Sequence, residues 1–334
     1  MHQIRGNKLE TLKVDSLRKY FFTKKGLMTR SLLLKAVDGV AFSIGEDKIF
    51  ALVGESGCGK STVARLVVGL IQPTSGKVLF QGKNIFEMNG DDLKRFRKSV
   101  QIIFQDPFAS LNPRKSIMDT VSEPLKIHKI VGKKSLKDKV IELLSKVGLG
   151  SDLLHRYPHE LSGGQRQRVC IARVIAVSPQ LIVADEPLSA LDISIQAQIL
   201  NLLNELKKEY RLSFLFISHD LKVVHYFSDT IGVMYLGKIV EYAKTEDLFN
   251  KPFHPYTEVL LSSAPVIPTS GLWSYTSRIT HHALHIIQGE VPSPIDIPPG
   301  CPFHTRCPKR FDPCNKIVPQ LKEIKGRLVS CHLF

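Results

Sequence analysis

Long hydrophobic runs are absent from this sequence of 334 residues. No stretch approaches the roughly 18 consecutive apolar residues that mark a transmembrane helix. The first ten residues are polar and lack the apolar core of a secretory signal, so we expect a cytoplasmic protein. Internal repeats and long low-complexity segments are also missing. The length and the 43% apolar content therefore favour a soluble globular protein with one large domain or two ordinary ones.

Acidic residues are in deficit, because 46 Lys and Arg stand against 31 Asp and Glu, a net charge of +15. Such a charge suits nucleic acid, an anionic membrane surface or nucleotide substrates. It is spread along the chain, however, and no basic ribbon interleaved with aromatic residues, of the kind that binds RNA, is present. A lysine-rich solvated surface explains the charge better, and we do not expect nucleic acid as a partner.

Cysteines are few and unevenly placed. Cys58 and Cys170 fall inside predicted core elements, whereas the other four crowd into the final 34 residues: Cys301, Cys307, Cys314 and Cys331. In a reducing compartment, such a quartet suggests a metal sooner than disulfides.

The spacing of these four, C-x₅-C-x₆-C-x₁₆-C, lacks the close C-x₂₋₄-C pairs that are typical of structural zinc. Four thiolates on an irregular, Pro-rich backbone suit a [4Fe–4S] cluster. Zinc and free thiols remain alternatives, and His304 and His332 are possible replacement ligands.

One stretch fits the phosphate-binding pattern G-x-x-x-x-G-K-[ST] at every fixed position: Gly54, Glu55, Ser56, Gly57, Cys58, Gly59, Lys60, Ser61 and Thr62. An apolar run, residues 49–53, precedes it as a predicted strand, and a helix is expected from Thr62 to Leu70. Glycines let backbone N–H groups close around an anion at a helix N-terminus. Lys60 can reach the β- and γ-phosphates, and Ser61 can ligate Mg²⁺. The pattern predicts a site for a nucleoside triphosphate.

A second acidic motif lies about 125 residues downstream, where an apolar strand, residues 181–184, ends in Asp185-Glu186-Pro187. A phosphate-loop fold places its second Mg²⁺-directing carboxylate at such a strand end, which fits Asp185. Glu186 beside it is then a candidate to orient or deprotonate the attacking water.

The remaining pattern alternates strands and helices. Two or more strands are expected between residues 9 and 44, and further strands at 77–80, 100–104 and 213–217. Between residues 106 and 158 the chain is Lys-rich with helical spacing of its apolar residues, which predicts a helical insertion between two strands. Residues 265–299 are rich in Pro and Ser and are expected to form a linker or an irregular extension.

Four further motifs follow the family order of the ATP-binding subunits of ABC transporters, which this chain closely resembles. They are Gln105 as the Q-loop glutamine, Leu161-Ser162-Gly163-Gly164-Gln165 as the signature sequence, Ser189-Ala190-Leu191-Asp192 as the D-loop and His219 as the H-loop histidine. The resemblance implies an α/β P-loop NTPase fold of the ABC type with an α-helical insertion and a small, irregular Cys-rich extension. We expect a nucleotide-binding domain at 1–264, with its helical subdomain at about 106–178, and the extension at 265–334.

The resemblance also implies roles. Two such domains pair head to tail, so that the phosphate loop of one faces the signature turn of the other. Gln105 would touch Mg²⁺ and the attacking water, and His219 would contact the γ-phosphate. An aromatic residue, Tyr20 or Phe21, would stack on adenine. The residues expected to bind nucleotide across the dimer interface are Ser162, Gly163, Gly164, Gln165 and Asp192.

Three segments narrow the resemblance to the ATPases of oligopeptide and dipeptide importers: residues 105–114, 253–257 and 300–308. That group implies a peripheral protein at the cytoplasmic face of a bacterial inner membrane. Its partners would be a second ABC ATPase, identical or different, two membrane-spanning permease subunits and, indirectly, an external peptide-binding protein. A nickel or other importer, and a non-transport ABC ATPase acting on nucleic acid, are the alternatives.

The same group is known to carry a [4Fe–4S] cluster in its Cys-rich ending. Because this ending lies far in sequence from the phosphate loop, we expect the cluster to be structural and basal ATPase activity to survive its loss.

Overall fold

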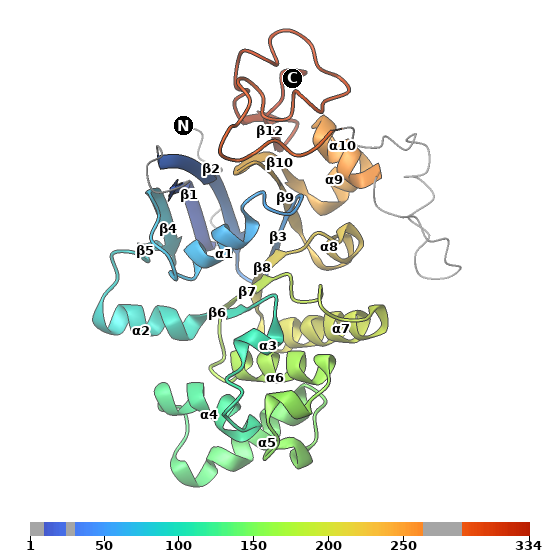
Figure 1. Ribbon diagram of the computed structural model, residues 1–334. Coiled ribbons are helices and arrows are strands. Elements are labelled where there is room, and N and C mark those ends of the chain that lie inside the picture. The colour runs from blue at the N-terminus through green and yellow to red at the C-terminus, as the bar shows by residue number, and fades with distance from the viewer. Residues whose placement is uncertain (1–9, 25–30, 263–288) are drawn as a thin grey trace.

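A computed structural model describes residues 10–24, 31–262 and 289–334 of the chain (Figure 1). Its central layer is an eight-stranded sheet in the order β11-β12-β10-β9-β3-β8-β7-β6. The parallel part of this sheet consists of β3 (Ile49–Val53), β6 (Val100–Ile103), β7 (Leu181–Asp185), β8 (Ser213–Ile217) and β9 (Thr230–Tyr235). Antiparallel strands extend it beyond β9: β10 (Lys238–Lys244), β12 (Arg327–Val329) and β11 (Lys322–Ile324).

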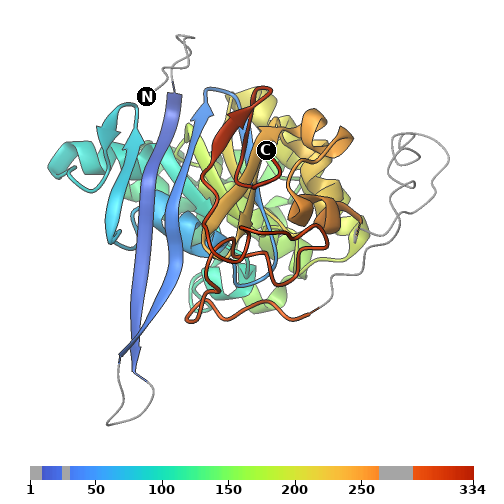
Figure 2. The same cartoon turned by 90° about the horizontal axis from the view of Figure 1, so that it is seen from above.

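A smaller antiparallel sheet has the order β2-β1-β4-β5. It is built around a long hairpin, which Figure 2 shows projecting from one side of the molecule. The strands of this sheet are β1 (Glu10–Lys24), β2 (Ser31–Gly45), β4 (Ser75–Phe80) and β5 (Lys83–Asn84). Two strands, β1 and β2, therefore occupy the region in which two or more were expected.

Strand β3 connects the two hydrophobic cores because its side chains alternate between the faces of the sheet. Phe50 and Leu52 pack with the small sheet and with α1 (Lys60–Val67). Ile49, Ala51 and Val53 belong to the other core, to which most of the remaining helices contribute. All five are buried, so the strand is a continuous apolar run of the kind typical of parallel sheets. This burial fixes the position at which the chain leaves the sheet at Gly54.

Helices fill the space between and below the strands, and the helical insertion forms a separate lower part in Figure 1. The insertion follows β6 and consists of α3 (Pro107–Ser110), α4 (Ile117–Ile127), α5 (Leu136–Lys146) and α6 (Gly163–Ile175). Short 3₁₀ helices lie at Lys133–Ser135, Ser151–Leu153 and Pro158–Glu160. The other helices are α2 (Gly90–Ser99), α7 (Ile193–Tyr210), α8 (Leu221–Phe227), α9 (Thr245–Asn250) and α10 (Pro255–Ser262).

The C-terminal segment packs onto the body of the protein. Strand β12 pairs with β10, with Val329 opposite Glu241. Phe303 is 1% exposed and packs against Tyr235 and Tyr256 of the main core. In Figure 2 this segment, in red, runs over β10. The residues from 289 onward are thus part of the same packed unit as the sheet.

Two predictions about elements are wrong in detail. The first helix ends at Val67, not Leu70, because Gly69 takes a left-handed φ of 72°, and Leu70 is 57% exposed. The extension is not irregular throughout, since β11 and β12 form a hairpin on the main sheet. The predicted domain boundary at residue 264, and much of the predicted linker, lie outside the described residues.

Candidate functional site

The phosphate loop connects the end of β3 to the start of α1. Gly59 precedes the helix with a φ of 109°, and a Cβ added there would stand 2.1 Å from the carbonyl oxygen of Ala36. A Cβ on Gly54 would likewise stand 2.2 Å from the carbonyl oxygen of Met234. Both positions therefore require glycine because neighbouring backbone passes too close for any side chain. Ser56 and Gly57 are exposed at the tip of the loop.

Lys60 is 4% exposed and folds back over the loop. Its Nζ donates to the carbonyl oxygen of Gly54 at 2.8 Å and to that of Glu55 at 3.0 Å. The buried thiol of Cys58 lies 3.8 Å from the same nitrogen. Thr62 follows in the first turn of α1 and is half-buried. The loop thus carries a buried positive charge held by carbonyl oxygens, which an anion can recruit.

The second acidic motif meets the phosphate loop at the end of β7. Ser61 Oγ donates to Asp185 Oδ1 at 3.0 Å, although 124 residues separate them. Burial raises the pKa of Asp185, and the hydrogen bond from Ser61 opposes that rise. A hydroxyl and a carboxylate are oxygen ligands of the kind that Mg²⁺ takes in phosphate-loop sites.

Two predicted residues converge on the carboxylate of Glu186, the residue after Asp185. Glu186 Oε2 accepts from Gln105 Nε2 at 3.1 Å and lies 3.2 Å from His219 Nδ1. Glu186 itself has a left-handed φ of 48°, and its N–H donates to Ile217 at 3.0 Å. The ends of β6, β7 and β8 therefore bring Gln105, Glu186 and His219 to one edge of the sheet, as parallel strands do.

The signature turn makes its hydrogen bonds locally. Ser162 caps α6, accepting from the N–H of Gln165 at 3.3 Å, while Gln165 Oε1 accepts from the N–H of Ser162 at 3.0 Å. This capping box leaves the amides of Gly163 and Gly164 at an open helix N-terminus. Figure 1 shows α6 in the lower, helical part of the molecule, apart from α1. The signature turn and the phosphate loop of one chain are therefore not brought together.

The D-loop lies beside the signature turn. Asp192 is exposed and precedes α7 without a side-chain capping bond. A Cβ added to Gly163 would stand 3.6 Å from Leu191, which places the two motifs in contact range. Ser189 Oγ donates to the carbonyl oxygen of Glu186 at 3.1 Å. The D-loop thus connects the Glu186 cluster to the signature turn.

The two aromatic candidates on β1 have different neighbours. Tyr20 Oη donates to Asp38 Oδ1 at 2.7 Å, and burial, with help from Asp38, raises the pKa of Tyr20 to about 12. The N–H of Asp38 donates to Gly237, whose own N–H donates to Cys58 in the phosphate loop. Phe21 instead contacts Lys19, which binds Gln72. Tyr20 is therefore the one connected to the phosphate loop.

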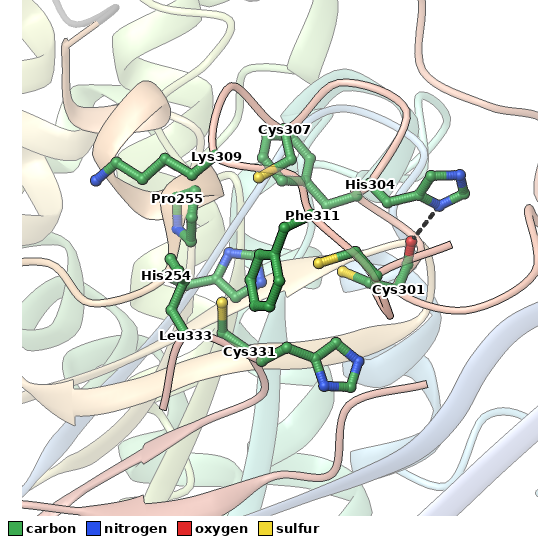
Figure 3. A pocket seen from close by; sticks show the side chains of 12 residues that line it. His254, Pro255, Cys301, His304, Cys307, Lys309, Phe311, Cys331 and Leu333 are labelled. Carbon is green, nitrogen blue, oxygen red and sulfur yellow. Dashed lines mark hydrogen bonds between the residues drawn. The ribbon is translucent and has the colours of Figure 1, made fainter. Parts of the chain in front are cut away.

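The four C-terminal cysteines line one pocket together with His254, Phe303, Phe311 and Leu333. Figure 3 shows the sulfurs of Cys301, Cys307 and Cys331 directed toward a common space. Every cysteine in the chain is a free thiol. Burial, reinforced by the three neighbouring thiols, raises the pKa of Cys301 to about 11. Four neighbouring, partly buried thiols ionise to thiolates at neutral pH only when positive charge lies between them.

Among the described residues, no three His, Cys, Asp or Glu side chains are arranged to hold a single metal ion. The two candidate replacement ligands are also engaged. His304 Nδ1 lies 2.8 Å from the carbonyl oxygen of Cys301, and His332 Nε2 lies 2.8 Å from that of Ile317 (Figure 3 shows the first). Burial lowers the pKa of His254 to about 3, so this third histidine is neutral.

Comparisons with known proteins agree with this geometry. The family described as ABC transporter matches residues 37–189, and that described as oligopeptide/dipeptide transporter, C-terminal region, matches residues 240–314. The oligopeptide transport ATP-binding protein AppF of Bacillus subtilis is 47% identical over 331 residues, which cover 98% of each chain. This chain belongs to the ATP-binding subunits of ABC transporters. The predicted family and ATPase class are confirmed.

Other members of the family extend the comparison. The dipeptide transport ATP-binding protein DppF of Escherichia coli is 44% identical over 320 residues, 96% of this chain and 93% of DppF. The ATP-binding cassette MJ0796, solved as a dimer in a post-hydrolysis state with ADP and Pi, is 27% identical with a TM-score of 0.63. The similarity covers 70% of this chain and 98% of the MJ0796 chain. The predicted ABC-type α/β fold is confirmed.

In the part of the chain that the structure describes, no helix is both long and apolar enough to cross a bilayer.

Two contacts of the phosphate loop were missed by sequence reasoning. The N–H of Glu55 donates to Tyr256 Oη at 2.9 Å, and its carboxylate binds Arg306. Both partners lie in the segments 253–257 and 300–308 that narrowed the resemblance. The Cys-rich ending, although far from the phosphate loop in sequence, therefore contacts it in space, because Arg306 binds Glu55 across 251 residues of sequence.

Proposed function

We propose that this ATPase powers the import of dipeptides or oligopeptides across a bacterial inner membrane. The observation that carries the ATPase chemistry is the convergence of Gln105 and His219 on Glu186, beside the Ser61–Asp185 pair. The peptide substrate is supported by the names of relatives that match nearly the whole chain. It is also supported by the match of residues 240–314 to the peptide-transporter C-terminal region.

In this proposal each side chain has a defined task. Lys60 and the loop amides bind the β- and γ-phosphates, and Ser61 and Asp185 would hold Mg²⁺, which neutralises charge on those phosphates. Glu186 takes a proton from the attacking water. Both of its described side-chain contacts use Oε2, which leaves Oε1 for that water. His219 and Gln105 fix the carboxylate, and either can turn toward the nucleotide.

The complete site requires a second ATPase subunit, identical or different. The signature turn offers the free amides of Gly163 and Gly164 at a helix N-terminus, yet lies away from the phosphate loop of its own chain. A head-to-tail dimer would bring the turn of one subunit, with Ser162 and Asp192, onto the γ-phosphate held by the other. The relative MJ0796, solved as a dimer with ADP and Pi, supports the pairing of two ATPase subunits.

Tyr20 is our choice over Phe21 for the adenine contact, because its hydrogen bonds lead through Asp38 and Gly237 to the phosphate loop. Both aromatics are only half-buried, so part of each side chain is exposed to solvent.

We also propose that Cys301, Cys307, Cys314 and Cys331 hold a [4Fe–4S] cluster. The pocket that they share supports this assignment, and its other walls are largely apolar. In such a cluster each thiolate binds a different iron, so the four sulfurs need not meet around one ion as they would for zinc.

Chemical analysis tests the cluster. Protein purified without oxygen should be brown and contain about four iron atoms per chain, as a Cys₄ cluster requires. Colourless protein with stoichiometric zinc would overturn the cluster.

Transport assays in cells test the substrate. Deletion of this chain should abolish uptake of labelled dipeptide or oligopeptide and leave nickel uptake unchanged, and re-expression should restore peptide uptake. The reverse pattern would establish the nickel alternative. This function further requires two permease subunits and places the chain peripherally at the cytoplasmic membrane face.

A further inference from the structure

Glu55 of the phosphate loop is held at two points by the C-terminal part of the chain. Its backbone N–H donates to Tyr256 Oη at 2.9 Å. Its carboxylate accepts two bonds from Arg306, Nη1 to Oε2 at 2.8 Å and Nη2 to Oε1 at 2.9 Å. This is a bidentate ion pair, the geometry in which guanidinium and carboxylate bind most strongly.

The pair is shielded from water. The side chain of Arg306 is 5% exposed and that of Glu55 is 21% exposed. By contrast, Lys309 of the same segment forms an ion pair with Glu258 in which the two side chains are 49% and 32% exposed. Exposed ion pairs contribute little, whereas removing one partner of a shielded pair leaves an uncompensated charge.

Arg306 is itself fixed by its surroundings. Its Nη1 lies 3.4 Å from Tyr235 Oη, and its guanidinium stands 6.0 Å from the centre of the Tyr235 ring. The next residue, Cys307, lines the cysteine pocket, and Phe303 anchors the same turn in the core. Order in the segment 300–314 is thereby transmitted to a residue of the phosphate loop.

We propose that Arg306 is a positioning residue for the phosphate loop. It neutralises the Glu55 carboxylate, which otherwise places a negative charge beside bound phosphates, and it fixes the loop at its first turn. Nucleotide affinity and the order of residues 300–314 are consequently linked, and each stabilises the other. The proposal rests on the nucleotide site alone and is independent of the cluster and of the transported substrate.

Nucleotide binding to matched variants tests the electrostatic part. Arg306→Ala should weaken MgADP binding, measured by calorimetry, and raise the KM for ATP by about tenfold or more, with kcat at saturation little changed. Arg306→Lys, which keeps the charge, should recover most of the affinity. Lys309→Ala, which removes the exposed pair in the same segment, should bind as the wild type does.

The double variant separates this role from general packing. Glu55→Gln removes the repelling charge, so Arg306→Ala with Glu55→Gln should bind MgADP more tightly than Arg306→Ala alone. An equal or larger loss in the double variant, or unchanged affinity in Arg306→Ala, would overturn the proposal.

Hydrogen exchange tests the linkage without any turnover. MgADP should slow amide exchange in residues 300–314 of the wild type and of Lys309→Ala. MgADP should leave exchange in these residues unchanged in Glu55→Gln. This variant keeps the side-chain volume of Glu55 and removes the ion pair by a change in the phosphate loop. Equal slowing by MgADP in Glu55→Gln and the wild type would contradict the linkage.

Discussion

At the scale of single residues, the proposed catalytic cluster of Gln105, Glu186 and His219 depends on the backbone at Glu186. This residue takes a φ of 48°, which is uncommon for a residue with a Cβ. Its N–H bonds to the end of β8, and its carboxylate meets Gln105 and His219. Unusual backbone conformations of this kind cluster where a side chain must be aimed.

Glu186→Gln should leave ATP binding intact and lower turnover by about 10²- to 10⁴-fold, because the amide cannot accept the proton of the attacking water. ATP should then trap the variant as a dimer. Steady-state ATPase assays and gel filtration with ATP measure both effects. Glu205→Gln, an exposed change on α7, is the matched control. Near-normal turnover of Glu186→Gln would eliminate Glu186 as the base.

The motif residues were predictable because their spacing is set by local chemistry. Glycines at 54 and 59 are required by close backbone contacts, and an acidic pair after an apolar strand indicates the Mg²⁺ edge of the sheet. The partners of Glu55 were not predictable in the same way. Arg306 reads as one basic residue among many, and only the packing of Phe303 brings it to the loop.

At the scale of elements, the start of α6 combines a helix cap with a binding surface. The side chains of Ser162 and Gln165 each accept a hydrogen bond from the other residue's backbone N–H, so the helix start is capped without a ligand. A carboxylate in the first turn interacts favourably with the helix dipole but repels a phosphate. Stability and hydrolysis can therefore be separated at Gly163.

Gly163→Asp should leave the melting temperature unchanged or slightly raised and lower hydrolysis by about 10²-fold or more. Affinity of the isolated monomer for ATP should not change, because in the proposed dimer the turn acts on the partner subunit's nucleotide. Ser135→Asp, which adds the same charge before α5, should preserve hydrolysis. Loss of monomer affinity in Gly163→Asp would show that the turn acts within its own chain.

A second element-scale prediction concerns the buried start of α10. Glu241 is 0% exposed, and its two oxygens accept from the N–H groups of Phe253 and His254, each at 2.9 Å. Glu241→Gln offers one oxygen for two donors and should lower the free energy of unfolding by ~1–3 kcal/mol in denaturant titrations. Glu323→Gln, an exposed change on β11, should have no measurable effect. Equal stability of both variants would contradict this role.

Elements with strong internal patterns were predicted well. The buried strands β3, β7 and β8 are apolar runs bounded by polar turns, and the helical insertion has clear helical spacing. The hairpin of β11 and β12 was not predicted, because each strand has only three residues and the hairpin joins the sheet only through the pairing of β12 with β10. Such short strands carry little signal of their own.

At the scale of the whole molecule, the C-terminal segment is an integral part of the ATPase. It adds strands to the main sheet, contributes Cys301 and Phe303 to the core, and reaches the phosphate loop through Arg306. Loss of order in this segment should therefore affect nucleotide binding, in contrast to what sequence separation alone suggests.

Cys314→Ser should reduce the iron content from about four atoms per chain to a small fraction, since the proposed cluster would lose a ligand. Protease sensitivity of residues 289–334 should rise, and the KM for ATP should increase. Cys170→Ser, a buried thiol outside the pocket, should retain its iron. Full iron content in Cys314→Ser would remove Cys314 from the ligand set.

The central claim is that ATP hydrolysis by this chain drives peptide import. Its most direct test uses vesicles that contain the purified transporter, with peptide and its binding protein on one side and ATP on the side of this chain. Labelled peptide should accumulate in an ATP-dependent manner with the wild type and with Glu205→Gln. It should not accumulate with Glu186→Gln. ATP hydrolysis by the wild type without peptide accumulation would contradict the claim.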